Sequence, residues 1–209
     1  MTNLARKLNY FAWALSGLVI ALAVIVVGQD YRWNVTGLSA YQWFPLFGLL
    51  AFSLMWVHYI IAALRVKLGI DKEATVLYFE STSLVVLILI LLHPGVLAWK
   101  LWQVGAGLPP GSYLNYVGQS LRLTIVGGMI ALLIFLAYEL RRKYSEASWW
   151  HWLQKASDVA MIMIFFHGLR LGSQLQSGWF QKVWYVYGLT LALAILFIYA
   201  QKGKRETKA

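Results

Sequence analysis

Long apolar runs separated by short polar segments form the main pattern of this chain. Six runs are about as long as the roughly 20 helical residues that cross a hydrocarbon core of about 30 Å. They are Phe11–Gly28, Trp43–Leu64, Val76–Trp102, Leu123–Leu140, Trp149–Leu171 and Val183–Tyr199. The pattern predicts an all-α fold, a bundle of six transmembrane helices that forms a single domain over residues 1–209.

The first run follows Arg6 and Lys7, as the apolar part of a signal peptide would. It ends in Val-Val-Gly-Gln-Asp, without a small-x-small cleavage site, so we interpret it as a membrane span.

Basic residues indicate how the bundle is oriented. If the N-terminus lies inside, thirteen of the eighteen Lys and Arg residues fall in inner segments, including the basic tail Gln201–Ala209. The outer segments then hold only Arg32, Lys100, Arg122, Arg170 and Lys182. Because cytoplasmic loops carry the excess of Lys and Arg, we predict that both termini are cytoplasmic.

Composition excludes several other classes of protein. With 60% hydrophobic residues, 12% charged residues and a mean hydropathy of +0.63, the chain is not typical of a soluble protein. The absence of cysteine excludes iron–sulfur clusters on Cys, thiolate zinc sites and thiol chemistry. We interpret the net charge of +10 as membrane orientation against anionic lipid, not as nucleic-acid binding.

Two of the four histidines are candidate ligands of a haem iron. His93 and His167 each lie about two-thirds of the way along an apolar run toward the outer side, so we expect them at one depth. Two imidazoles on different helices can hold a haem from its two faces, which favours electron transfer over oxygen binding. In the alternative interpretation, both are buried histidines that bond to a carbonyl or hydroxyl group.

The neighbours of these histidines are compatible with haem. Gly95 and Gly168 leave room for a flat macrocycle beside each ligand. Arg170, one turn beyond the second histidine, could meet a haem propionate, as could Lys100 or Arg122. These three cations are equally typical of charges at a membrane interface.

The outer segment Gln103–Leu121 is long, rich in Gly and Pro, and almost uncharged. It either lies over the outer mouth of a site or simply connects two helices at the interface.

Three stretches of the chain resemble a known family. They are Gly48–Arg65, the Leu-Leu-His-Pro of Leu91–Pro94, and Trp150–Gly168, which ends in Phe-Phe-His-Gly. Together they are similar to the ferric-reductase-type transmembrane domain, over about Trp43–Ala200. That family includes ferric reductases, NADPH oxidases and the bacterial haem subunit that serves periplasmic methionine sulfoxide reductase. The resemblance implies six helices and up to two stacked b-type haems, with two histidines on the third helix and two on the fifth.

Carried over to this sequence, the resemblance implies one haem b. His93 and His167 match the outer pair of ligands, whereas Phe79 and Gln154 stand where the inner pair would be. The other two histidines, His58 and His151, remain candidates for a second haem bound in a way that the family does not use. Against this, His151 lies among three tryptophans, which is typical of an interfacial aromatic belt.

Polar residues in the inner half form a possible second site. His58, Glu80, Gln154 and Asp158 could bind a quinone and handle its protons. Asp158 could equally pair with Lys155, and ordinary ion pairs explain Glu139 beside Arg142 or Lys143.

The function we expect is that of a membrane b-type cytochrome in the bacterial inner (plasma) membrane, which could serve as the electron-transfer subunit of an oxidoreductase. No Gly-rich phosphate loop is present, so the electron donor would be a separate flavoprotein or a quinol, and the acceptor would be a protein or small molecule on the outer side. The alternative is a cofactor-free helical scaffold or assembly subunit. A small transporter is disfavoured, because the helices lack paired breaks and the charges cluster at their ends.

Overall fold

The fold is all-helical. The structure is a computed structural model that describes residues 3–34, 36, 38–139 and 146–206. Over these residues it contains seven α-helices and three short 3-10 turns, with no strand. The α-helices are α1 (Asn3–Asp30), α2 (Ala40–Leu68), α3 (Val76–Gln103), α4 (Gly111–Tyr116), α5 (Arg122–Glu139), α7 (Trp150–Leu171) and α8 (Trp179–Glu206). The 3-10 turns are η1 (Lys72–Thr75), η2 (Gln119–Leu121) and η3 (Ser173–Leu175).

Within the described residues, five helices are long and apolar enough to cross a membrane: α1, α2, α3, α5 and α8. Helix α7 has 22 residues but is not among them. Its first three turns carry His151, Gln154, Lys155 and Asp158, which lower its hydropathy. A long helix therefore occupies each of the six predicted runs, and five of these helices have the composition of a membrane span.

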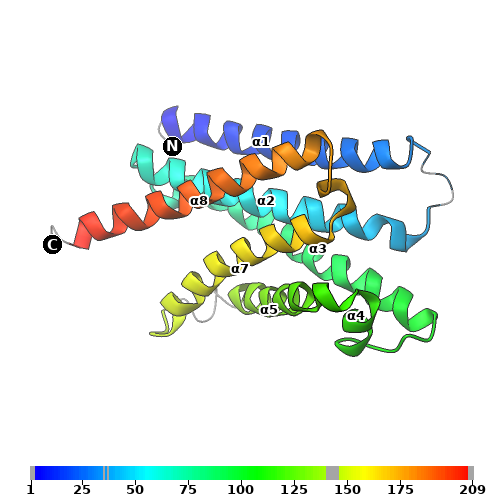
Figure 1. The fold of residues 1–209 in the computed structure, drawn as a ribbon. Coiled ribbons are helices and arrows are strands. Elements are labelled where there is room, and N and C mark those ends of the chain that lie inside the picture. The colour runs from blue at the N-terminus through cyan, green and yellow to red at the C-terminus, as the bar shows by residue number, and fades with distance from the viewer. Residues whose placement is uncertain (1–2, 35, 37, 140–145, 207–209) are drawn as a thin grey trace.

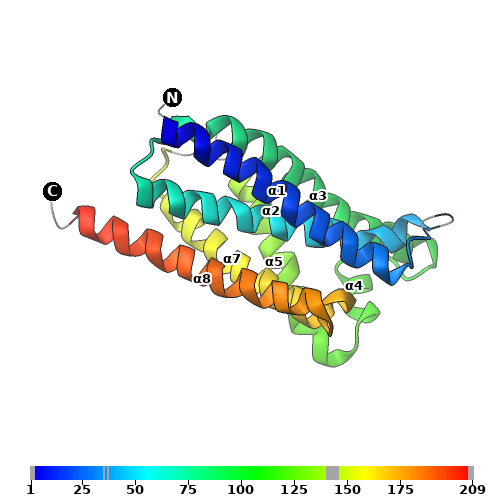
Figure 2. The ribbon, with the colours of Figure 1, turned by 90° about the horizontal axis from the view of Figure 1, so that it is seen from above.

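The helices pack as two groups around α2. Helices α1, α3 and α8 surround α2, whereas α5 and α7 pack mainly on each other (Figures 1 and 2). Helix α2 is apolar on all sides, which is typical of a helix buried within a protein. Phe52, Val57 and Ile61 are accordingly almost completely buried.

Both ends of α2 carry recognisable end signals. The backbone N–H of Ser39 donates to Oε1 of Gln42, which anchors the first turn at 2.8 Å. At the other end Gly69 adopts φ +63°, the left-handed conformation that commonly terminates helices.

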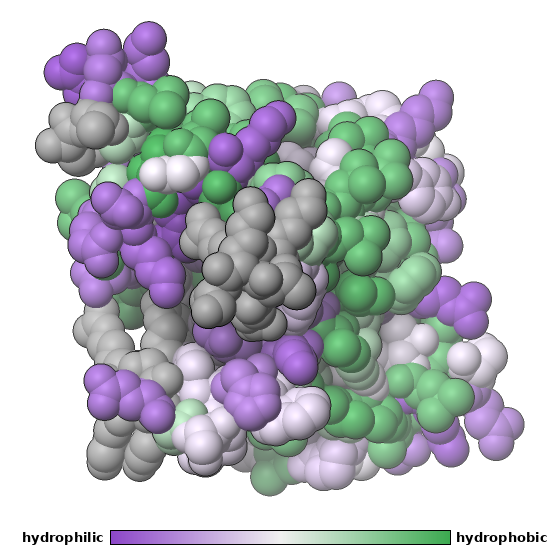
Figure 3. Space-filling view, turned by 90° about the vertical axis from the view of Figure 1, so that its left-hand side faces the viewer, coloured by the Kyte–Doolittle hydropathy of each residue, from purple (hydrophilic) through white to green (hydrophobic). Residues whose placement is uncertain are grey.

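The first and last described residues, Asn3 and Glu206, lie at the same end of the bundle, which we call the inner end (Figure 1). Hydrophilic residues are spread over this end in the space-filling view (Figure 3). Basic residues at the inner ends of the described helices and turns include Arg6, Lys7, Arg65, Lys67, Lys72, Lys155 and Lys202. Positive charge is therefore concentrated at this end of the described helices.

Candidate functional site

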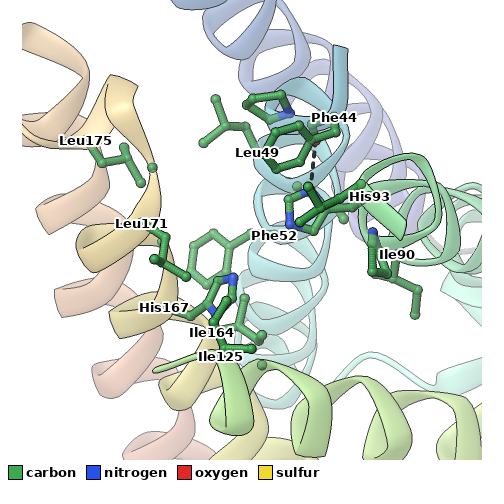
Figure 4. Close-up of a pocket in the computed structure, with 18 of the residues that line it drawn as sticks. Phe44, Leu49, Phe52, Ile90, His93, Ile125, Ile164, His167, Leu171 and Leu175 are labelled. Carbon is green, nitrogen blue, oxygen red and sulfur yellow. Dashed lines mark hydrogen bonds between the residues drawn. The ribbon is translucent and has the colours of Figure 1, made fainter. Parts of the chain in front are cut away.

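A cavity of about 470 Å³ lies toward the outer end, between the two groups of helices. Helices α2, α3, α5 and α7 supply most of its wall, and α4, η3, α8 and the segment after α1 contribute the rest. Its lining is mainly aliphatic and aromatic, including Leu49, Phe52, Ile90 and Ile164 (Figure 4). The volume is in the range of cavities that hold cofactors and other small molecules.

His93 reaches this cavity from α3. Its Nδ1–H donates to the backbone carbonyl of Phe44 on α2 over 2.7 Å, which fixes the ring and leaves Nε2 as the unprotonated nitrogen. The ring lies directly against Gly48, where an added Cβ would come within 2.8 Å of its Cε1 atom. A glycine at this position therefore makes room for the imidazole.

His167 is held in the same way from α7. Its Nδ1–H donates to the carbonyl of Thr124 on α5 over 3.1 Å. An added Cβ at Gly128 would lie 2.7 Å from Cε1 and Nδ1 of this imidazole. In both cases the glycine follows the acceptor carbonyl by four residues, or about one helical turn. The α2–α3 and α5–α7 pairs therefore hold their histidines in the same arrangement.

The two imidazoles point toward one another across the cavity (Figure 4). Their ring centroids are 6.5 Å apart and their planes are inclined by 77°. A metal between two imidazole nitrogens needs about 2 Å for each bond, and each nitrogen lies roughly 1 Å from its ring centroid, which gives a centroid separation of roughly 6 Å. The observed separation thus suits one metal ion bound between the rings.

The remaining donors indicate what kind of metal group would fit. In the part of the chain that the structure describes, neither Nε2 atom has a hydrogen-bond partner, and no cluster of three or more His, Asp or Glu side chains could hold a metal ion. Two histidines oriented through Nδ1 by carbonyls, in an apolar cavity, suit an iron that brings its own equatorial nitrogens. His93 and His167 are therefore the residues that could hold such an iron.

The predicted propionate partners lie outside this cavity. Arg170 and Lys100 are exposed, and neither lines the cavity wall. Arg122 is exposed as well, and its Nε donates to the carbonyl of Leu114 over 3.3 Å. All three side chains thus lie away from the cavity wall.

The outer segment Gln103–Leu121 covers part of the cavity. Its central portion forms α4, from which Tyr113 and Tyr116 line the cavity. The phenol of Tyr113 donates to the carbonyl of Pro94 over 2.6 Å, and Tyr116 shares a hydrogen bond with Tyr41 of α2. Burial raises the pKa of Tyr113, which keeps its phenol protonated as a donor.

The inner candidates are distributed over different faces. Nε2 of His58 lies 2.7 Å from the hydroxyl of Thr82 on α3, and the His58 ring contacts Phe79 edge-on. Asp158, by contrast, accepts hydrogen bonds from Tyr59 at 2.8 Å and from Tyr199 at 2.6 Å. Asp158 is thus held by tyrosines of α2 and α8, whereas His58 faces α3.

The other inner candidates lie near the surface. Glu80 and Gln154 are exposed, and so is His151, whose Nδ1–H donates to the carbonyl of Ser148. Lys155 lies over the ring of Trp152, with its Nζ 4.7 Å from the ring centroid. The predicted pairing of Glu139 with Arg142 or Lys143 lies outside what the structure describes. It describes neither Arg142 and Lys143 nor the side chain of Glu139.

Sequence reasoning identified the two histidines but not what holds them. It missed the carbonyls of Phe44 and Thr124 and the role of Gly48 and Gly128. It also missed Gln174, a buried residue of η3 that lines the cavity. No local pattern marks these residues, because each acts on a partner far away in the chain.

Comparisons of the chain with models of known protein families, with curated proteins and with solved structures found no match.

Proposed function

We propose that this protein is a membrane b-type cytochrome that carries electrons through one haem held by His93 and His167. The observation that carries the proposal is the arrangement of these two imidazoles, 6.5 Å apart across an apolar cavity, each oriented by a backbone carbonyl. A haem bound there would supply a one-electron redox centre. Because both axial positions would be filled by histidine, the site favours electron transfer over oxygen binding.

The contribution of the chain itself would be to position the ligands and to exclude water. The carbonyls of Phe44 and Thr124 hold each Nδ1–H, which directs Nε2 toward the iron. The apolar lining gives the site a low dielectric, which is one of the factors that set a haem potential.

The proposal includes a single haem and an even number of membrane crossings. Phe79, at the inner position on α3, packs against His58, whose Nε2 is already bonded to Thr82. These contacts support the expectation that His58 is not an iron ligand. With α7 as the sixth span, both termini would be cytoplasmic, in the inner membrane of a bacterium, as the basic inner end favours.

The electron donor and acceptor would be separate molecules. We expect a flavoprotein or a quinol as donor and an acceptor on the outer side, because no nucleotide-binding pattern occurs in the chain. The competing function is a cofactor-free scaffold subunit of a membrane complex.

Absorption spectra of the purified, detergent-solubilised protein, with and without dithionite, test this proposal. We expect a low-spin haem b spectrum that is lost in His93→Ala and in His167→Ala. His151→Ala is the control, because His151 is exposed at the inner end and should leave the spectrum nearly unchanged. A normal spectrum in His93→Ala would refute the ligand assignment.

The amount of haem per chain distinguishes the remaining alternatives. A pyridine haemochrome assay should give close to one haem per chain. Two haems would show that an inner site exists, and His58→Ala would then reveal whether His58 binds it. Complete absence of haem, from protein produced in cells supplied with haem, would favour the scaffold.

A further inference from the structure

The cavity has one polar wall, at its outer end. Tyr31, Tyr41, Gln42, Tyr113, Tyr116, Ser173 and Gln174 all line it there. Among the described residues that line the cavity there is no Lys, Arg, Asp or Glu. Any polar group of a bound molecule that reaches this wall would therefore meet neutral hydrogen-bonding partners and no cation.

Gln174 is a residue of this wall whose hydrogen bonding is incomplete. It is only 7% exposed, and its Oε1 atom is buried without a hydrogen-bond partner in the described part of the chain. An unpaired buried acceptor is costly, so such atoms in native proteins usually have a partner.

The orientation of this side-chain amide is determined by Asp30. Nε2 of Gln174 donates to Oδ2 of Asp30, at the end of α1, over 2.8 Å. Rotation of the amide by 180° would place two oxygens against each other, because a carboxylate can only accept. Gln174 therefore presents an acceptor, and the missing partner must be a donor.

We propose that Gln174 accepts a hydrogen bond from an uncharged donor group of the molecule that fills the cavity. If the molecule is the haem of the proposed function, on which this assignment rests, the donor is a protonated carboxylic acid group at the haem edge. A buried wall of neutral side chains without a cation favours the neutral form of a carboxyl group, and the neutral form can donate. The haem edge would thus be held by neutral hydrogen bonds at the outer mouth, and not by the surface cations Arg170, Lys100 and Arg122.

A competition between two haems tests this assignment. The full-length protein, produced without haem and kept in detergent, is offered an equimolar mixture of haemin and haemin dimethyl ester, in which both acid groups are capped. The bound porphyrins are then extracted and their ratio is measured by mass spectrometry. The wild-type protein should retain the free acid in preference to the ester, by roughly five- to tenfold for one buried hydrogen bond.

Two substitutions identify the acceptor. Gln174→Met keeps the shape of the side chain and removes the acceptor, so the preference for the free acid should disappear. Asp30→Asn allows the amide of Gln174 to rotate and to present Nε2, a donor that the carbonyl of either the acid or the ester can accept from, so the preference for the free acid should weaken. Gln176→Met is the matched control, since Gln176 is exposed on the same segment and does not line the cavity.

The ratio of bound porphyrins does not depend on how much of each variant folds. The two haems partition unequally into detergent, but this effect is the same for every variant and drops out when variants are compared. An unchanged ratio in Gln174→Met would overturn the inference, although a bis-histidine spectrum in the same samples would leave the proposed function intact. Failure of the wild-type protein to bind either haem would instead count against the proposed function itself.

Discussion

At the scale of single residues, the site depends on glycines that allow two imidazoles to lie against neighbouring helices. Gly48 and Gly128 occupy equivalent positions, one turn after the carbonyl that orients each histidine. A side chain at either position would overlap the ring and displace Nε2. The small size of these glycines is therefore needed to position the histidines of the proposed site.

Gly128→Ala should lower haem occupancy while the helices remain folded. The added Cβ would lie 2.7 Å from the His167 ring, and such overlap typically costs about 1–3 kcal/mol, equivalent to roughly a fivefold to 150-fold loss of haem affinity. Haem titration of the apoprotein, followed by the Soret absorbance, measures the change.

The adjacent glycine supplies the control for this substitution. At Gly127 an added Cβ would meet only the flexible end of Met163, at 3.3 Å, so Gly127→Ala should bind haem almost as wild type does. Equal affinities in the two variants would show that Gly128 has no role in positioning His167.

The contrast between the histidines and their partners shows how far sequence reasoning reached. The depth of His93 and His167 could be read from their positions within apolar runs, since helical rise converts residue number into distance. Their partners could not, because Phe44 lies 49 residues from His93, and Thr124 lies 43 from His167. Such pairings depend on which helix faces are adjacent, and hydropathy alone does not determine this.

At the scale of helices, Asp158 joins three elements of the inner half. It accepts hydrogen bonds from Tyr59 of α2 and Tyr199 of α8, and it lies on α7. Helix α7 contacts α8 and α2 less extensively than it contacts α5. The carboxylate therefore contributes to attaching the α5–α7 pair to the remaining helices.

Asp158→Ala should lower the thermal stability of the purified protein. Removing the carboxylate leaves two phenols without their acceptor, and hydrogen bonds to a charged group contribute about 1.5–3 kcal/mol each. Loss of helical circular dichroism on heating in detergent measures the apparent Tm.

Asp158→Asn is the informative companion because it keeps one acceptor oxygen, and it should lose less stability. Lys155→Ala is the control on the same helix, since Lys155 contacts Trp152 and not the tyrosines. Equal Tm values for Asp158→Ala and the wild type would show that the two hydrogen bonds do not stabilise the bundle.

The helices also differ in how well sequence predicted them. The run Trp149–Leu171 anticipated α7 to within one residue, and Val76–Trp102 anticipated α3 equally well. Helix α4 was not predicted as a helix, because six residues after two prolines carry no clear periodicity. Its packing over the cavity arises from tertiary contacts, such as the bond from Tyr113 to Pro94.

At the scale of the whole molecule, the path of α7 determines the topology. If α7 crosses the membrane the number of spans is even, and both termini lie on one side, as their common end of the bundle suggests (Figure 1). The chain contains no cysteine, so single-cysteine variants can be labelled without background.

Ser148→Cys and Ser177→Cys, which flank α7, should react with a membrane-impermeant maleimide from opposite sides. We expect Ser177→Cys to be labelled in spheroplasts and Ser148→Cys only in inverted vesicles. Asn34→Cys and Lys72→Cys mark the outer and inner sides as controls. Labelling of both test positions from one side would show that α7 does not cross, and reversed labelling would show that the termini lie outside.

The depth of the proposed haem limits how electrons can reach it. His93 and His167 each lie seventeen residues beyond the first residue of their helix, Val76 and Trp150, which corresponds to about 25 Å of helix. A flavoprotein docked at the basic inner end would be too remote for fast direct transfer to a single haem at this depth. We therefore expect either a redox group in the inner half or a quinol that approaches the outer cavity from the membrane.

Reduction kinetics distinguish these routes. Quinone-free protein with one verified haem per chain is mixed with a soluble quinol analogue or with a flavin reductase and its reduced cofactor, and haem reduction is followed by stopped-flow absorbance. The quinol should reduce the haem much faster than the flavin enzyme does, because only the quinol can dissolve in the apolar interior. Unchanged quinol kinetics in Asp158→Asn would show that the inner carboxylate takes no part in this route. The outer cavity would then be the expected place of quinol reaction. Rapid reduction by the flavin enzyme alone would contradict the distance argument, and would require an inner redox centre within the chain.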